Sequence, residues 1–141
     1  MKTSFLSKIA MITLFIAFAV ASVAAQSGSR VVVSIPFDFA VGEKTLSAGE
    51  YTIKTVSRNS SQAVLIQSAD GSESVVTITN RVEARDPQAK SKVLFRQYGD
   101  KYFLSQVWTK GSAAGRELPR SQAERDHLAK ASVRTVAIDG R

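Results

Sequence analysis

Apolar residues occupy every second position from residue 31 to residue 41, and this alternation constrains the fold more than any other feature of the chain. The apolar positions are Val31, Val33, Ile35, Phe37, Phe39 and Val41. A spacing of two places side chains on one face of an extended strand, whereas a helix would need a spacing of about 3.6. Pro36 cannot donate a backbone hydrogen bond, so we expect two strands joined by a kink.

Residues 1–25 indicate export. Lys2 and Lys8 precede an apolar run at 9–20, and small residues follow at 21–25. This order is typical of a cleavable secretory signal peptide, and the apolar run is shorter than the about 20 residues that a membrane span needs. We therefore expect cleavage before Gln26, a single mature domain over residues 26–141, a periplasmic or extracellular location and no integral membrane segment.

Composition narrows the chemistry of this domain. The chain has no cysteine, which rules out disulfides, thiol catalysis and zinc sites built on thiolates. Without the two lysines of the signal peptide, 17 Lys and Arg face 12 Asp and Glu, so the mature charge is 17 − 12 = +5. A solvated basic surface is the simplest interpretation, and attraction to an anionic glycan or lipid surface is the sharper one. Nucleic acid is disfavoured, because no binding motif is present.

The dipeptide Asp70-Gly71 lies between two runs rich in valine and isoleucine. It suits a two-residue hairpin turn with positive φ values. Counting outward pairs Ile66 with Val75 and Leu65 with Val76. Both faces of this hairpin are then apolar, so we expect it to be buried between layers or to lie in the centre of a sheet.

Gly99-Asp100 predicts a second hairpin within residues 92–110. Counting outward places Arg96 opposite Phe103, where a cation–π contact is expected. Strict alternation also places Trp108 on the same face as Leu104.

The remaining segments supply strands at 51–57 and 133–138, and connections at 42–50, 81–91 and 111–120. Ser121 and Glu124 form a capping-box pattern that predicts a surface helix at about 122–131. We count seven or eight strands. Sequential hairpins of this number predict an all-β, mainly antiparallel fold, either a β-sandwich or a small β-barrel, with one short C-terminal surface helix.

Catalytic, metal and cofactor chemistry is not indicated. His127 is the only histidine, and with no cysteine it lacks the partners of a metal site or an activated nucleophile. A carboxylate-based hydrolase or isomerase stays open, because carboxylates distant in sequence can converge in a fold. The candidates are Asp38, Glu43, Glu50 and Glu117.

Aromatic and cationic residues around the second hairpin and the following loop form the most site-like group. Aromatic rings beside cations suit a sugar or an anionic headgroup, although the same residues would also suit the core and rim of a hairpin. The candidate binding residues are Arg96, Tyr98, Lys101, Tyr102, Trp108 and Arg116.

Four segments carry a resemblance that spans nearly the whole mature chain. Residues 35–39, 48–53, 98–104 and 115–119 are IPFDF, AGEYTI, YGDKYFL and GRELP. They resemble segments of an uncharacterised family of small exported β-rich proteins of soil bacteria. The resemblance implies an exported β domain and carries over no activity, ligand or catalytic residue. Ser47 departs from the pattern, since the family would have proline there.

The leading hypothesis is a non-enzymatic exported envelope protein that binds a protein partner, a glycan or an anionic lipid surface. The alternatives are a barrel that carries a small hydrophobic ligand, a carboxylate-based enzyme and an outer-membrane barrel. The last is disfavoured, because Leu65, Val76 and Phe103 would occupy lumen positions that need polar residues.

Overall fold

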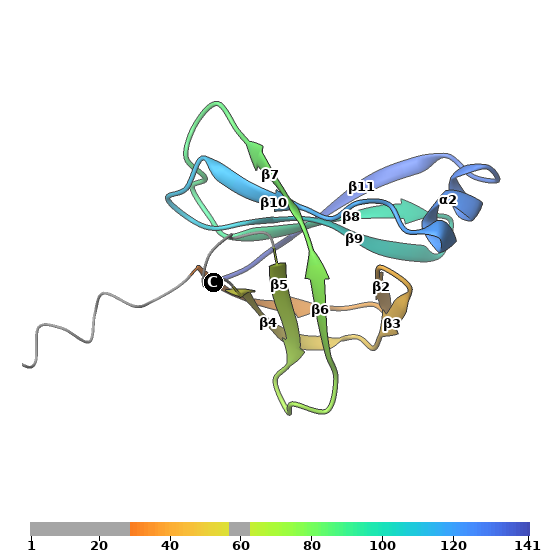
Figure 1. Ribbon diagram of the computed structural model, residues 1–141, viewed down its shortest axis with the longest axis horizontal. Coiled ribbons are helices and arrows are strands. Elements are labelled where there is room, and N and C mark those ends of the chain that lie inside the picture. Colours follow the sequence, from red (N-terminus) through yellow and green to blue (C-terminus); the bar gives the residue numbers. More distant parts are fainter. Residues whose placement is uncertain (1–28, 57–62) are drawn as a thin grey trace, which may run out of the picture.

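The computed structural model describes residues 29–56 and 63–141. The predicted signal peptide and the last residue of the strand expected at 51–57 lie outside the described residues. Within them the chain forms eleven strands in two sheets and one helix, α2 (Gln122–Leu128), which confirms the predicted β-sandwich with a short C-terminal helix (Figure 1). None of the helical structure in these residues is both long and apolar enough to cross a membrane.

The first sheet contains four antiparallel strands in the order β1-β4-β5-β6. Its strands are β1 (Arg30–Ile35), β4 (Gly49–Val56), β5 (Ala63–Ser68) and β6 (Ser74–Ile78).

The second sheet follows the order β11-β8-β9-β10-β7, and β2 joins β9 in parallel while pairing with β3. Its strands are β2 (Phe39–Val41), β3 (Lys44–Leu46), β7 (Asn80–Glu83), β8 (Lys92–Tyr98), β9 (Lys101–Trp108), β10 (Ala114–Glu117) and β11 (Val133–Asp139).

Seven or eight strands were expected, and three short strands, β3, β7 and β10, account for the difference between eleven and the upper of these values. Each lies in a segment that we predicted to be a connection, and they have three, four and four residues. Alternation over so few residues gives a weak signal. β7 and β10 also pair between residues far apart in the sequence, such as Arg81 and Arg116, so no local turn signal predicts them.

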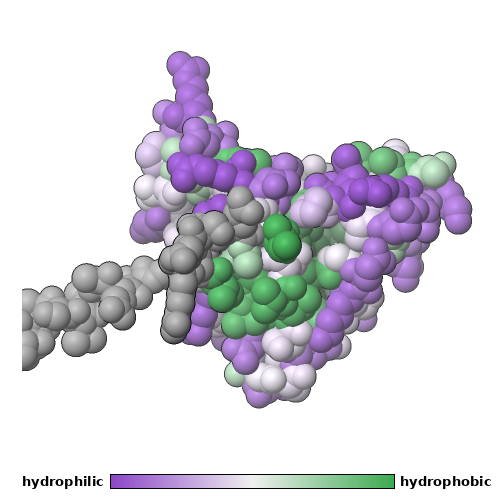
Figure 2. Space-filling model, viewed as in Figure 1, coloured by the Kyte–Doolittle hydropathy of each residue, from purple (hydrophilic) through white to green (hydrophobic). Residues whose placement is uncertain are grey.

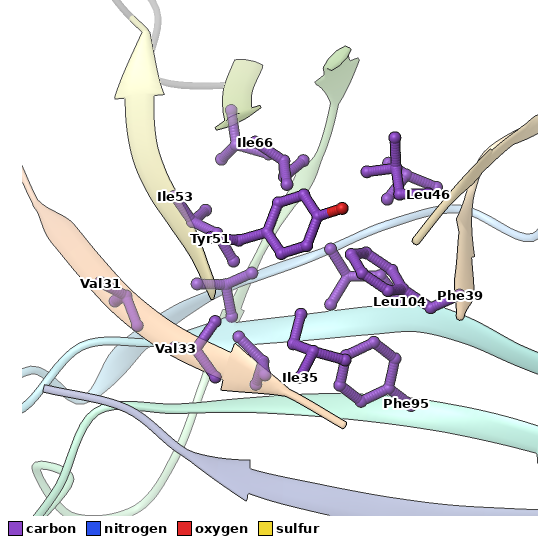
Figure 3. Packing of buried hydrophobic residues seen from close by; sticks show 14 of the residues in the cluster. Val31, Val33, Ile35, Phe39, Leu46, Tyr51, Ile53, Ile66, Phe95 and Leu104 are labelled. Carbon is purple, nitrogen blue, oxygen red and sulfur yellow. The ribbon is translucent and has the colours of Figure 1, made fainter. Parts of the chain in front are cut away.

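Side chains from both sheets meet in a continuous core (Figure 3). In β1, Val31, Val33 and Ile35 are buried and the residues between them are more exposed, as the alternation predicts. The strand ends before Pro36, and β2 begins at Phe39, which confirms the predicted break. Leu46, within the segment 42–50 that we predicted to be a connection, is fully buried.

Both hairpin registers are as predicted: Ile66 pairs with Val75, and Arg96 pairs with Phe103. The first turn is nevertheless different from the expected two-residue turn. Gly71 has a φ of 75° but Asp70 has no positive φ, and the Gly71 amide donates to the Ser68 carbonyl at 3.0 Å. This geometry is that of a longer loop built around a tight turn.

The prediction that the first hairpin is buried on both faces is wrong. β6 is an edge strand, and Val76 and Ile78 are 60% and 67% exposed. Figure 2 shows hydrophobic residues over β4, β5 and β6, bordered by hydrophilic ones. Alternation alone cannot distinguish an edge strand from a central one, because both carry side chains on two faces.

A β-bulge between Leu94 and Phe95 overturns the predicted face of Trp108. Across it, Phe95 pairs with Leu104 but Leu94 pairs with Gln106, so Ser105 is the extra residue on β9. One inserted residue exchanges the faces of all that follow. Val107 therefore joins the core, and Trp108 lies on the outer face of the second sheet.

The last residues, which follow the strand expected at 133–138, connect the two sheets. The Arg141 amide donates to the Val32 carbonyl at 2.9 Å, and the Val32 amide donates to the Arg141 carbonyl at 2.9 Å. Gly140 forms a bridge with Val33. One side of the sandwich is thus joined by the chain end, and the cleft described below lies between β4 and β5 of one sheet and β7 and β10 of the other.

Candidate functional site

The six predicted binding residues lie in several separate places on the second sheet. Arg96 and Tyr98 are covered by α2, Trp108 lies against β10, Lys101 and Tyr102 border one cleft, and Arg116 lines another. These residues are close together along the chain, but they lie on different surfaces because of the strand directions and the β-bulge.

Arg96 and Tyr98 belong to a buried polar cluster that attaches α2 to the sheet. The Arg96 guanidinium contacts the Glu124 carboxylate through Nε and Nη2, and donates to the Ser105 hydroxyl at 3.0 Å. It also donates to the Leu118 carbonyl at 3.1 Å. The Tyr98 hydroxyl donates to Glu124 at 2.9 Å. The expected approach of Arg96 to Phe103 is thus replaced by a carboxylate pair.

Burial, and then the bond to Glu124, raises the pKa of Tyr98. The Glu124 side chain is 2% exposed and the Arg96 side chain 11%, so neither is presented to a large ligand. Both residues have a structural role in this geometry.

The capping box is realised only in part. The Ser121 hydroxyl accepts from the Glu124 amide at 3.1 Å, as predicted. The Glu124 side chain turns into the sheet instead of back to the helix start. The helix is also shorter than expected, ending at Leu128.

Trp108 is 7% exposed and covered by its neighbours. Its indole lies against the backbone of Gly115, where an added Cβ would come within 2.6 Å of the ring. The indole nitrogen donates to Gln106 at 3.0 Å. Trp108 is therefore a packing residue, which is the alternative interpretation given for the aromatic group.

Lys101 and Tyr102 border a cleft of about 510 Å³ between β2, the β8–β9 turn and α2. The Tyr102 ring stacks on Phe37 with centroids 3.7 Å apart. Other residues lining this cleft are Asp38, Glu43, Asp100 and His127.

The carboxylates of this cleft serve the fold. Asp38 accepts from the Ala48 amide at 2.9 Å. Glu43 accepts from the Gln122 amide at 2.9 Å and so caps the start of α2. Of the other two candidates, Glu50 pairs with Arg141 and Glu117 accepts from Gln106. The residues that the structure describes contain no group of acidic, histidine or cysteine side chains able to hold a metal ion.

Arg116 faces a third place, an open cleft of about 440 Å³ between the two sheets. Arg116 pairs directly with Arg81 across β10 and β7, and both line the cleft. Core side chains from both sheets form the floor, and four hydroxyl residues lie on the walls. The floor and walls are Val31, Ile53, Val64, Val107, Ser29, Thr55, Thr109 and Ser112.

The electrostatics of this inter-sheet cleft are one-sided. No carboxylate is among its lining residues. Arg81 pairs with Glu83 at 3.0 Å on the exposed side, whereas the Arg116 side chain has no hydrogen bond or ion pair within residues 29–56 and 63–141. Like charges directly opposite on neighbouring strands destabilise a sheet. Glu83 offsets part of this repulsion through its ion pair with Arg81, and an anion bound beside Arg116 would offset more of it.

Arg81 is the cleft residue that the sequence did not single out. It lay in a segment expected to be a loop, and its partner Arg116 is distant in sequence. A weak signal exists in the alternation of Arg81 and Glu83 with Val82, but four residues are too few to identify a strand.

Comparisons with protein-family models, with curated proteins and with solved structures find no significant match to this chain. The resemblance to exported soil-bacterial proteins therefore stays a prediction, and function has to be argued from the geometry of the inter-sheet cleft.

Proposed function

We propose that this protein is an exported, non-catalytic binding domain that captures an anionic group in the inter-sheet cleft. The observation that carries the proposal is the direct cross-strand pairing of Arg81 and Arg116, both facing a cleft whose lining residues include no carboxylate. Export is supported by the leader pattern of residues 1–25.

Two arginines paired on neighbouring strands at one cleft suit a carboxylate or phosphate group. Each guanidinium presents a planar fork of donors that matches two oxygen atoms, and hydrogen bonds between ionised groups are stronger than neutral ones. Arg116 is half-buried, and attraction to an anion grows as the local dielectric falls. A small anion would thus be held more firmly here than on an open basic surface.

A structural explanation competes with this proposal. β7 is the edge strand of the second sheet, and inward-pointing charges protect such edges from pairing with other chains. That role needs only one charge on β7. It does not account for a second arginine opposite, on β10, where the edge is already covered by β7.

Isothermal titration calorimetry of the purified protein with inorganic phosphate, sulfate and glucuronate tests the proposal. We expect at least one anion to bind, with an affinity that falls as salt rises. Arg116→Gln should weaken binding by about tenfold or more, since hydrogen bonds to charged groups contribute about 1.5 to 3 kcal/mol.

Arg134→Gln is the matched control, because Arg134 is exposed on β11, away from the cleft residues. Failure of all three anions to bind would refute the proposal. Equal losses in Arg116→Gln and Arg134→Gln would also refute it, since they would indicate attraction to overall charge.

The alternatives draw less support from the geometry. A carrier of a hydrophobic ligand needs an apolar cavity, but the core residues between the sheets are in mutual contact. A carboxylate-based enzyme needs paired acidic groups, and the four candidates each bond to a different partner.

A further inference from the structure

We infer that the ligand of the inter-sheet cleft is a sugar acid, a uronate residue of an acidic polysaccharide, rather than a phosphate-bearing lipid headgroup. This inference rests on the proposed anion site and specifies its ligand. Three features of the cleft support it: the two arginines paired across β7 and β10, the hydroxyl-bearing walls and the close packing of the apolar floor.

The hydroxyl residues on the walls come from both sheets and their connections. Thr55 and Thr109 are half-buried and make no side-chain hydrogen bond to another described residue. Ser112 is different, because its hydroxyl donates to the Ala114 carbonyl at 3.0 Å. A threonine hydroxyl both donates and accepts. The two threonines therefore complement the ring hydroxyls of a sugar, which also donate and accept.

The floor of the cleft does not admit an acyl chain. Val31, Ile53 and Val64 are 1%, 2% and 1% exposed, and Val107 is 7% exposed. These side chains are already packed in the core, so a lipid tail could enter only by displacing them. Such overpacking is destabilising. A sugar bound through polar contacts with the arginines and threonines of the walls does not need to enter this floor.

The size of the cleft agrees with a short segment of a polymer. Its volume of about 440 Å³ lies in the lower part of the range of about 300 to 1,000 Å³ found for small-molecule sites. The cleft is open to solvent, so a chain can enter and leave it. A uronate would place its carboxylate between Arg81 and Arg116, with its hydroxyls towards Thr55 and Thr109.

The test measures the affinity of the purified protein for oligogalacturonate and for the same oligomer with its carboxyl groups reduced to alcohols. Inorganic phosphate and vesicles containing phosphatidylglycerol are measured in parallel. We expect oligogalacturonate to bind at least about tenfold more tightly than the reduced oligomer, because the charge-assisted bonds to Arg81 and Arg116 are lost. We also expect it to bind more tightly than phosphate.

Thr55→Val and Thr109→Val remove a hydroxyl at nearly constant volume. Each should weaken oligogalacturonate binding about threefold to tenfold, as the loss of a neutral hydrogen bond predicts, and leave phosphate binding unchanged. Thermal unfolding of both variants checks that the fold is retained.

The outcomes separate this inference from the proposed function. Phosphate binding that depends on Arg116, with oligogalacturonate no tighter and no effect of the threonine variants, overturns the sugar-acid inference alone. Arg116-dependent binding to vesicles, in preference to oligogalacturonate, overturns it in favour of a lipid headgroup. No binding of any of these probes overturns both.

Discussion

Replacing Glu124 by leucine tests whether the buried ion cluster holds α2 in place. Glu124 is 2% exposed, and the Arg96 guanidinium and the Tyr98 hydroxyl both donate to it. Removing one partner of a buried ion pair leaves an uncompensated charge and typically costs about 3 to 5 kcal/mol. This cost is reduced in Glu124→Leu, because the Ser105 hydroxyl and the Leu118 carbonyl still accept hydrogen bonds from Arg96. We therefore expect a loss of about 3 kcal/mol.

The assays are urea unfolding and thermal unfolding, both followed by the fluorescence of Trp108, the single tryptophan of the chain. For a domain of this size each 1 kcal/mol lowers the melting temperature by about 4 °C or more, so Glu124→Leu should melt at least about 10 °C below the wild type. Adding Arg96→Met should recover most of the loss, since apolar residues of similar volume can replace a buried pair without net cost.

Two results would refute this reasoning. One is a loss below about 1 kcal/mol in Glu124→Leu, the value typical of an exposed ion pair. The other is a double variant no more stable than Glu124→Leu. Hydrogen exchange of residues 122–128 adds a check, because local detachment of α2 would speed exchange there without moving the urea midpoint.

Three further predictions concern packing and pH. Ile66→Ala should lower the free energy of unfolding by about 2 to 5 kcal/mol, because Ile66 is fully buried. Ile78 is 67% exposed on an edge strand, so Ile78→Ala should change it by less than about 0.5 kcal/mol. Equal losses in urea unfolding would contradict the assigned burial. Gly115→Ala should lower the free energy of unfolding by about 1 to 3 kcal/mol and shift Trp108 emission, because the new Cβ would lie 2.6 Å from the indole ring. Wild-type emission and stability in this variant would contradict the packing of the indole against Gly115. Hydrogen bonds from Ser68 and Ser72 lower the pKa of Asp70 to about 2, so ionised Asp70 stabilises the fold above its unfolded-state pKa of about 4, and this stabilisation is lost as the pH falls towards 2. Asp70→Ala should therefore be less stable than the wild type at neutral pH, and the difference should shrink between about pH 4 and pH 2. Urea titrations at several pH values would measure this difference.

Local patterns predicted the elements that depend on neighbouring residues. The alternation at 31–41 located β1, β2 and the break at Pro36. Turn dipeptides set both hairpin registers, and the serine of the capping box located the start of α2. These features could be recognised because turns, caps and side-chain periodicity involve interactions within a few residues.

The candidate site was far less predictable. Trp108 was assigned to the wrong face, because a bulge leaves no mark in a pattern of alternation. Glu124 was expected to cap the helix and instead binds Arg96 from the neighbouring sheet. Arg81 was overlooked because its position opposite Arg116 depends on the pairing of two short, distant strands.

The sequence by itself determined that residues after the leader pattern form β-strands, where several of them turn, and that thiol chemistry is absent. Tertiary structure alone decided which strands lie at edges, which face Trp108 occupies and which cations share a cleft. The reason is physical: alternation and turn residues encode local conformation, whereas the meeting of Arg81 with Arg116 between two sheets is a property of long-range pairing and of the packing that supports it.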